Sequence, residues 1–231
     1  MNEEAISIII PVLNEEGQIK ELINNVQKLQ YDDGNEIIVV DGGSSDRTAE
    51  LAKRAGAKVV VADKGRAKQM NAGARAARGD VLYFLHADTT PPKLFDREIL
   101  KAIQKGYGFG CFRLVFDWDH PILRFYSYFT RFRLTEIRFG DQSLFVQKKL
   151  FEKAGGFDED LIVMEDQKIV RDLKRIGSFY LSERNVITSA RKYRNVGVIR
   201  LQLIFTFVWL GYYAGLSQEV LFHFYKNQIS S

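Results

Sequence analysis

Residues 6–12 read Ile-Ser-Ile-Ile-Ile-Pro-Val (ISIIIPV), a continuous run of apolar and mainly β-branched side chains. Such a run is typical of a strand that is buried on both faces, as the strands of a parallel sheet are. The segment EIIVVD at Glu36–Asp41 has the same character, and Lys58–Ala62 and Val81–His86 are two further apolar runs. The first part of the chain therefore predicts four buried strands.

Helical patterns separate these strands. After the first strand, Asn14 is in position to cap a helix whose apolar side chains recur at helical spacing. Further helices are predicted at Asp46–Ala55, Arg66–Arg78 and Pro92–Lys105. Strands that alternate with helices form parallel sheets that are covered on both faces. We therefore expect an α/β fold with a Rossmann-like, mostly parallel central sheet and helices on both faces.

The second half of the chain is less regular. Strands are predicted at Phe109–Phe116, Ser143–Val146, Phe179–Leu181 and Val186–Ala190, and helices at Lys148–Ala154 and Asp166–Arg175. No internal repeat, low-complexity tract or linker interrupts the sequence. We therefore predict a single domain over residues 1–231 that ends in a C-terminal helical segment.

The composition excludes several classes of protein. Apolar residues make up 46% of the 231 residues, which is enough for a packed core and excludes wholesale disorder. The single cysteine excludes a disulfide framework, and three histidines far apart in sequence exclude a His-x-x-x-His zinc motif. The acidic N-terminus runs straight into a strand pattern with no signal peptide before it, so we expect a cytoplasmic protein.

The basic residues are unevenly distributed. Residues 1–110 hold 15 basic and 16 acidic side chains, whereas residues 111–231 hold 18 and 13. Five basic side chains and no acidic one lie between Arg184 and Arg200. A basic second half suits an anionic ligand or an anionic surface, and the alternative is a solvated face that keeps the protein soluble. We expect no nucleic-acid partner.

Two apolar segments lie in this basic half. Leu201–Leu216 is apolar except for Gln202 and Thr206, but its 16 residues are short for a membrane span of about 20. Pro121–Phe139 combines six aromatic side chains with four arginines. Aromatic and cationic side chains together favour a membrane surface with anionic lipids, so we expect a peripheral protein on the inner face of the cell membrane. The alternative is that both segments pack on the core.

Asp41 ends a buried strand at the carboxyl edge of the sheet, where open α/β sheets bind ligands. The turn that follows, GGSSD, lacks the Gly-x-Gly-x-x-Gly pattern of dinucleotide-binding sites. A carboxylate repels phosphate but accepts hydrogen bonds from a base N–H or a ribose hydroxyl, which favours the nucleoside end of a ligand. The alternative is a plain strand-to-helix turn in which Ser44 or Ser45 caps the helix.

Two further groups follow the third and fourth strands. Lys64-Gly65-Arg66-Ala67-Lys68 brings three cations to a helix N-terminus, a combination that binds anions or simply begins a solvated helix. His86 and Asp88 have the i, i+2 spacing that turns two side chains of an extended segment to the same side. A carboxylate there can hold Mg²⁺ or Mn²⁺ against a diphosphate, and the alternative is an Asx turn before two prolines.

Acidic residues also occur in two segments of the second half, Gly140-Asp141-Gln142-Ser143 and Met164-Glu165-Asp166-Gln167. Two adjacent acids at a helix start most often only compensate the helix dipole. If they face a cleft, one of them can instead act as a general base.

The chain resembles the family 2 glycosyltransferases, enzymes with the GT-A fold, and looks closest to a short bacterial subgroup of them. The resemblance rests on seven segments that occur in the order of the family: IIIPVLNEE, IVVDGGSSDRT, KGRAKQMNAGA, YFLHADT, GDQSLFV, FEKAGGFDE and MEDQKIVRDLKRIG. It runs from about Ile6 to Arg194 and so covers most of the chain.

The resemblance implies a nucleotide-binding half at residues 1–110, an acceptor-binding half at 111–200 and C-terminal helices at 201–231. In the first half, Asp41 would hold the base or the ribose, and Lys64 and Arg66 would line the phosphate side. Three more residues would lie around the nucleobase and ribose: Pro11, Asn14 and Glu15.

The resemblance also implies a divalent metal, Mn²⁺ or Mg²⁺, on Asp88, the second acid of the family's Asp-x-Asp motif. His86 stands at the first position of that motif, and histidine ligates Mn²⁺ readily but suits Mg²⁺ poorly. We therefore expect Asp88 to bind the metal, with His86 either as a second ligand or facing the donor. Asp166 would be the catalytic base with Glu165 beside it. Five residues would serve the diphosphate or the acceptor: Asp141, Gln142, Arg191, Lys192 and Arg194.

The implied reaction is an inverting transfer of a sugar from a nucleoside-diphosphate sugar, expected to be UDP-linked, to an acceptor hydroxyl of a lipid or another apolar molecule. One rival is a nicotinamide-dependent oxidoreductase, against which the missing glycine pattern and Asp41 count. Another is a non-catalytic nucleotide-binding protein on the same fold, against which Asp88 and the pair Glu165-Asp166 count.

Overall fold

The computed structural model of the chain describes residues 5–134 and 140–229. These residues form an eight-stranded sheet whose strands lie in the order β3-β2-β1-β4-β7-β6-β8-β5. The strands are β1 (Ile6–Val12), β2 (Glu36–Asp41), β3 (Lys58–Val61), β4 (Val81–Phe84), β5 (Thr89–Thr90), β6 (Phe109–Phe116), β7 (Phe145–Gln147) and β8 (Phe179–Thr188).

The sheet is mostly parallel, as the sequence predicts. β1 pairs in parallel with both β2 and β4, β2 with β3, and β6 with β8. The short strand β7 is antiparallel to both β4 and β6 and so joins the two parallel parts. Because the strands of the first part run the same way, the ends of β1, β2 and β4 open on one edge of the sheet.

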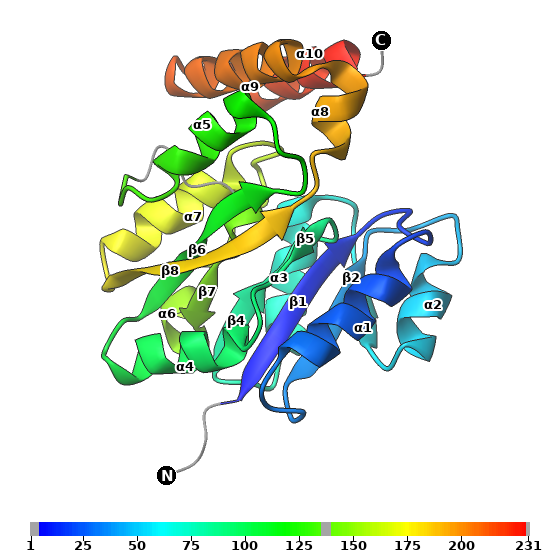
Figure 1. Ribbon diagram of the computed structural model, residues 1–231, viewed down its shortest axis with the longest axis vertical. Helices are drawn as coiled ribbons and strands as arrows, with labels where there is room; N and C mark the ends of the chain where they lie inside the picture. Colours follow the sequence, from blue (N-terminus) through cyan, green and yellow to red (C-terminus); the bar gives the residue numbers. More distant parts are fainter. Residues whose placement is uncertain (1–4, 135–139, 230–231) are drawn as a thin grey trace.

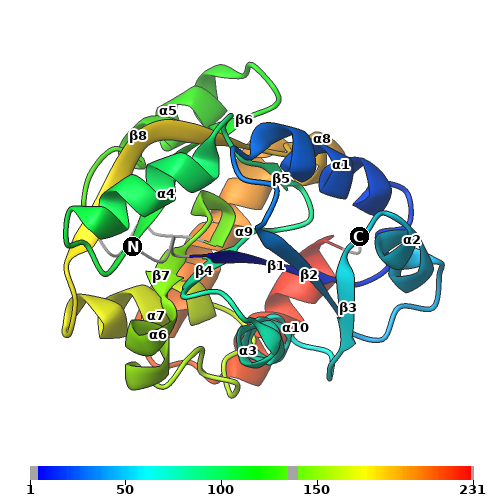
Figure 2. The same ribbon diagram turned by 90° about the horizontal axis from the view of Figure 1, so that it is seen from below.

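Helices cover both faces of the sheet, which confirms the predicted fold class (Figures 1 and 2). One face packs against α1 (Ile19–Leu29), α2 (Thr48–Arg54) and α4 (Phe95–Gln104). The other packs against α3 (Arg66–Ala76), α6 (Lys148–Lys153) and α7 (Glu165–Lys174). The side chains of β1 alternate between these two cores, since Ile8 and Ile10 belong to one and Ile9 to the other. This two-sided burial is the physical reason for the continuous apolar run.

The predicted helix cap at Asn14 is wrong. Helix α1 begins only at Ile19, and Gln18 occupies the capping position without a side-chain hydrogen bond. Asn14 lies in the left-handed region with a φ of 55°, and its Oδ1 accepts a hydrogen bond of 2.9 Å from the backbone N–H of Ser45. The side chain therefore ties two loops together and is not available to the helix.

The two strands predicted at Phe179–Leu181 and Val186–Ala190 are one strand, β8. It pairs with β6 along its length, with a register shift between Cys111 and Arg113. The polar residues 183–185 in its middle are exposed, and they interrupt the apolar pattern without ending the strand.

Four more helices gather at one end of the molecule (Figure 1): α5 (Pro121–Phe129), α8 (Arg191–Val196), α9 (Val198–Tyr213) and α10 (Gln218–Ile229). A third core of buried side chains, including Leu123, Tyr193 and Leu201, packs α5, α8 and α9 together. Helix α9 begins before the predicted Leu201 and ends at Tyr213. Of the segment Pro121–Phe139, residues 135–139 lie outside the described residues. Within the described part of the chain, no helix is long and apolar enough to cross a membrane.

Candidate active site

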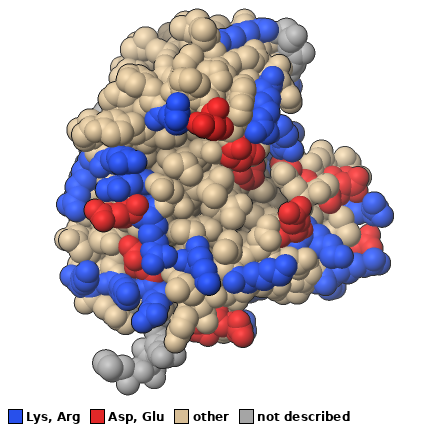
Figure 3. All heavy atoms as spheres, in the orientation of Figure 1, with Lys and Arg blue, Asp and Glu red and all other residues tan. Residues whose placement is uncertain are grey.

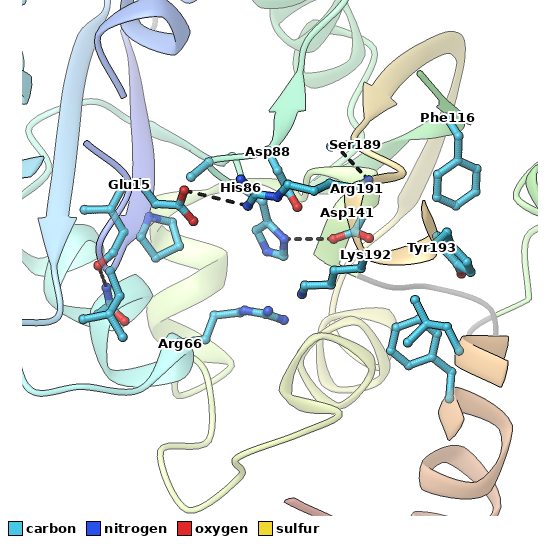
Figure 4. Close-up of a pocket in the computed structure, with 17 residues that line it drawn as sticks. Glu15, Arg66, His86, Asp88, Phe116, Asp141, Ser189, Arg191, Lys192 and Tyr193 are labelled. Atoms are coloured by element: carbon cyan, nitrogen blue, oxygen red, sulfur yellow. Dashed lines mark hydrogen bonds and ion pairs between the residues drawn. The ribbon is translucent and has the colours of Figure 1, made fainter. Parts of the chain in front are cut away.

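A pocket of about 250 Å³ opens at the carboxyl edge of the sheet (Figure 4). Its floor comes from the ends of three strands: Pro11 at the end of β1, His86 and Asp88 after β4, and Phe116 at the end of β6. The segment after β8 contributes Ser189 and the first residues of α8. This is the position at which open α/β sheets bind ligands.

His86, Asp88 and Asp141 form a cluster in this pocket. Asp141 belongs to the short 3-10 helix at Gly140–Gln142, and its Oδ1 lies 3.0 Å from Nδ1 of the buried His86. One ligand atom from each of the three residues lies within 4.8 Å of the others. One nitrogen and two carboxylate oxygens fit a divalent cation, and the imidazole suits Mn²⁺ better than Mg²⁺.

The bond between His86 and Asp141 shifts both groups towards an ion pair. Burial lowers the pKa of His86, but the hydrogen bond to Asp141 and the negative charges of Asp141 and Asp166 together outweigh it, so that the pKa lies above its ordinary value. Burial raises the pKa of Asp141, but His86, Arg66 and Lys192 outweigh this and lower it. A cation bound to His86 replaces the proton on the imidazole, so metal binding is expected to strengthen as the pH rises.

Arg66 joins the pocket to the acidic pair at the start of α7. It is the first residue of α3, and its Nη1 lies 3.3 Å from Oε1 of Glu165 and 3.8 Å from Oδ2 of Asp166. Just before α7 the chain passes through Met164 with a φ of 70°, an unfavourable conformation for a residue with a side chain. Burial and the neighbouring Asp166 raise the pKa of Glu165 to about 7.

Asp166 and His86 both lie against Gly140. A Cβ atom on Gly140 would collide with Oδ2 of Asp166 and would stand 2.7 Å from Nε2 of His86. The loop therefore approaches these two side chains as closely as only glycine allows. The acidic pair predicted to hold the catalytic base thus lies beside the cluster of candidate metal ligands.

Two basic side chains of α8 line one side of the pocket. Arg191 and Lys192 begin this helix and line the pocket. Nη2 of Arg191 lies 3.9 Å from Oε2 of Glu15, which follows β1 on the opposite side (Figure 4). This ion pair connects the segment after β1 with the start of α8.

Asp41 lies at the same edge of the sheet but not in the pocket lining. It is buried, and its Oδ1 accepts hydrogen bonds from the backbone N–H and the hydroxyl of Ser44, at 3.0 and 2.5 Å. The carboxylate therefore shapes the turn after β2.

Besides Asp41, Glu165 and Asp166, four more of the predicted residues lie outside the pocket lining. Asn14 and Lys64 lie in neighbouring loops, and Gln142 is buried against Cys111. Arg194 points to Asp117 and stacks on Trp118, with its guanidinium carbon 5.5 Å from the ring centre. The structure thus brings together Pro11, Glu15, Arg66, His86, Asp88, Asp141, Arg191 and Lys192 in the pocket, with Glu165 and Asp166 directly behind Arg66.

The sequence does not reveal two features of the pocket. Gln69 on α3 donates two 2.8 Å hydrogen bonds, to the carbonyls of Val12 and Val40, and so connects the ends of β1 and β2. Its only signal is a polar side chain on the buried part of this helix, which it shares with Asn71. The second feature is an apolar wall at the far end of the pocket, formed by Phe116, Tyr193, Leu201 and Phe205.

The fold and this site define a transferase with the GT-A fold. A family model described as glycosyl transferase family 2 matches residues 7–154, and the chain therefore belongs to that family. An undecaprenyl-phosphate 4-deoxy-4-formamido-L-arabinose transferase of Pseudomonas aeruginosa is 36% identical over 115 residues, covering 45% of this chain. The match spans 34% of that relative's length. Membership in this family gives no support to the alternative of an oxidoreductase.

Two solved structures share the fold. One is a mannosyltransferase of Pyrobaculum calidifontis in complex with GDP-mannose and Mn²⁺, with a TM-score of 0.70 and 18% identity over 93% of this chain and 65% of that one. The other is a glucosyl-3-phosphoglycerate synthase of Mycobacterium tuberculosis with Mn²⁺ and UDP, with a TM-score of 0.63 and 19% identity over 92% of this chain and 81% of that one. At these identities the likeness concerns the fold alone.

Proposed function

We propose that this glycosyltransferase moves a sugar, with inversion, from a nucleoside-diphosphate sugar to an acceptor hydroxyl carried by a lipid or another apolar molecule. One observation carries the proposal: Arg66 lines the same pocket as the cluster of His86, Asp88 and Asp141 and forms ion pairs with Glu165 and Asp166. A cation site and fixed positive charges then meet within one pocket, with a carboxylate base beside it, as glycosyl transfer from a diphosphate requires.

The donor would lie along the edge of the sheet. Pro11 and Glu15 would flank the nucleoside, and Asp41 would support that end through the turn that it shapes. The diphosphate would lie between Arg66 on one side and Arg191 with Lys192 on the other. Arg191 also lies 3.9 Å from Glu15, so a donor phosphate would compete with this carboxylate for the cation. UDP is the donor nucleotide that we expect.

His86, Asp88 and Asp141 would hold a divalent cation, Mn²⁺ or Mg²⁺. A cation bound at such a site neutralises charge that develops on a leaving diphosphate. Arg66 supplies fixed positive charge on the same side, since burial lowers its pKa less than Glu165 and Asp166 raise it. The guanidinium thus stays protonated throughout the reaction.

Asp166 would accept the proton of the acceptor hydroxyl. The hydroxyl oxygen then forms a bond to the anomeric carbon while the bond from that carbon to the diphosphate breaks on the opposite face. The side chain of Glu165 is almost fully buried, whereas that of Asp166 is 17% exposed, so Asp166 is the member of the pair that an acceptor can reach. This leaves Asp166 as the proton acceptor, a role that contributes about 10²–10⁴ to the rate.

The acceptor would lie against the apolar wall of the pocket, which α8 and α9 supply. Tyr193, Leu201 and Phe205 offer this part of the ligand hydrocarbon and aromatic surface. The undecaprenyl-phosphate relative, whose name includes a lipid carrier, supports a lipid-linked acceptor. We propose a cytoplasmic enzyme that works as a peripheral protein on the inner face of the cell membrane.

The test is release of nucleoside diphosphate from a panel of UDP- and GDP-sugars, with Mn²⁺ and a set of polyprenol and polyprenyl-phosphate acceptors. The wild-type protein should release nucleotide in an acceptor-dependent way. Asp166→Asn should bind the donor normally but transfer about 10²–10⁴ more slowly, because the amide accepts no proton. A loss of less than about tenfold would remove Asp166 as the base. No acceptor-dependent release from any donor would contradict the proposed function.

A further inference from the structure

The outer side of helix α9 exposes a line of large apolar side chains. Ile199 and Leu203 are each 65% exposed and Leu210 is 55% exposed, and Phe207 lies in the same line. The opposite side of the same helix is buried, since Leu201, Ile204 and Val208 face the protein. A helix that is apolar all round is normally covered on every side, so the exposed side of α9 indicates an interaction surface.

Helix α5 extends this exposed apolar area. Phe125 is 60% exposed, and its ring centre lies 5.0 Å from that of Phe129. Tyr128 and Phe132 are also exposed, and their rings pack edge to face in the same cluster. Helices α5 and α9 share the third core and lie at the same end of the molecule (Figure 1). The exposed apolar side chains of these two helices together are named the outer apolar surface. They are Phe125, Tyr128, Phe129, Phe132, Ile199, Leu203, Phe207 and Leu210.

The segments around this surface carry an excess of basic charge, although Asp119 pairs with Arg124 and Asp117 with Arg194. Residues 120–134 contain three arginines and no acid, and residues 184–218 contain five basic side chains and no acid. In Figure 3 the end of the molecule that carries α9 and α10 is mostly uncharged, and basic side chains lie beside it with a few acidic ones among them. An apolar surface with aromatic and basic side chains matches the interface of a membrane that contains anionic lipids.

A second copy of this chain fits the surface less well. A two-fold interface brings the same patch of both copies together, so the basic excess of one copy would face the basic excess of the other. Like charges opposed in this way weaken association. The charge pattern therefore selects the anionic lipid surface as the occupant.

We infer that the outer apolar surface docks the protein on an anionic lipid membrane, an inference that deepens the proposed function by naming the surface involved. Helix α9 belongs to both the pocket and the outer apolar surface, so docking affects the reaction. Its buried residue Leu201 and the half-buried Phe205 belong to the apolar wall of the pocket, while Leu203 and Phe207 face outward. Docking therefore brings the lipid surface to the acceptor end of the pocket. An acceptor held in the membrane can then reach the site without leaving the membrane.

The test is flotation with vesicles of phosphatidylcholine, with and without phosphatidylglycerol. The wild-type protein should float with the anionic vesicles, and added salt should release it. The double variant Leu203→Glu/Leu210→Glu should lose about tenfold or more in vesicle affinity, because two exposed leucines no longer enter the lipid. Tyr31→Glu/Val61→Glu is the control, since it adds the same charge at two exposed apolar positions elsewhere and should bind within about twofold of wild type.

Calorimetric binding of UDP with Mn²⁺ separates this inference from the proposed function. The leucine variant should bind the nucleotide as wild type does, which shows that the site is folded and functional. The docking inference is overturned if wild-type protein ignores anionic vesicles at low salt, or if both double variants lose affinity equally. It is also overturned if the wild type is a dimer that Leu203→Glu/Leu210→Glu dissociates, because a second copy then covers the surface.

Discussion

Replacing Arg66 with methionine should expose how strongly one guanidinium holds the acidic pair in place. The change keeps most of the apolar stem but removes the cation that lies 3.3 Å from Glu165 and 3.8 Å from Asp166. At 3.3 Å and an effective dielectric constant of about 20, one such pair corresponds to about 5 kcal/mol of Coulomb energy. Arg66 is about half exposed, so solvent screening reduces the expected loss of stability to about 1–3 kcal/mol.

This loss should depend on pH. The pKa of Glu165 is already raised to about 7 and should rise further without the cation. At about pH 5 the carboxyl of Glu165 is mostly protonated in both proteins, so the loss of stability is small. At about pH 8 the carboxyl is mostly ionised in wild type, so the variant shows the full loss of stability. Urea unfolding of wild type and Arg66→Met at the two pH values measures the difference, and Arg66→Lys, which keeps the charge, should lie between them.

The same variant should also bind UDP with Mn²⁺ at least about tenfold more weakly, because Arg66 faces the proposed diphosphate position. Arg75→Met is the matched control, since Arg75 is an exposed arginine on the same helix outside the pocket lining, and its removal should leave the affinity unchanged. Equal losses of stability at both pH values, or unchanged affinity for UDP in Arg66→Met, would refute the role assigned to Arg66.

Two further variants probe the surroundings of the acidic pair. Glu165 adds stability below its unfolded pKa of about 4.5, and this stability is lost as the pH rises through about 7. In urea unfolding, Glu165→Gln should therefore gain about 1–3 kcal/mol of stability relative to wild type as the pH rises from about 4.5 to 7. If the stabilities of the two proteins change in parallel with pH, the pKa of Glu165 is not raised. Gly140→Ala should weaken Mn²⁺ binding at least about tenfold, because the added methyl group displaces Asp166 and His86. Gly17→Ala, whose methyl group would meet nothing within 4 Å, is the control, and equal Mn²⁺ affinities in titrations of both variants would contradict the close approach.

The first half of the fold could be predicted because local signals decide it. The ranges Ile6–Val12 and Glu36–Asp41 are the observed bounds of β1 and β2, since both strands are buried on two faces and leave no ambiguity in the pattern. His86 and Asp88 face the same pocket as their spacing predicts. Asn14 is not a helix cap because it accepts a hydrogen bond from Ser45, which lies 31 residues away in sequence. A local sequence pattern cannot predict such a long-range contact.

The second half of the site depends on contacts between distant parts of the chain. Asp141 reaches His86 across 55 residues, a contact that depends on β7 pairing antiparallel beside β4. The apolar wall needs α9 to fold back over the end of β6, which no motif in either segment indicates. The roles of the site residues and the division of the chain at residues 110 and 200 stay predictions.

Titration calorimetry of UDP and GDP, with and without Mn²⁺, on wild type and Asp88→Ala tests the central claim most directly. If the pocket at the carboxyl edge is a metal-assisted donor site, the wild type should bind one of these nucleotides with Mn²⁺ and at least about tenfold more weakly without it. Asp88→Ala should lose that dependence on the metal, because one of the three clustered ligands is gone. Binding of equal strength with and without Mn²⁺, unchanged in Asp88→Ala, would contradict the account.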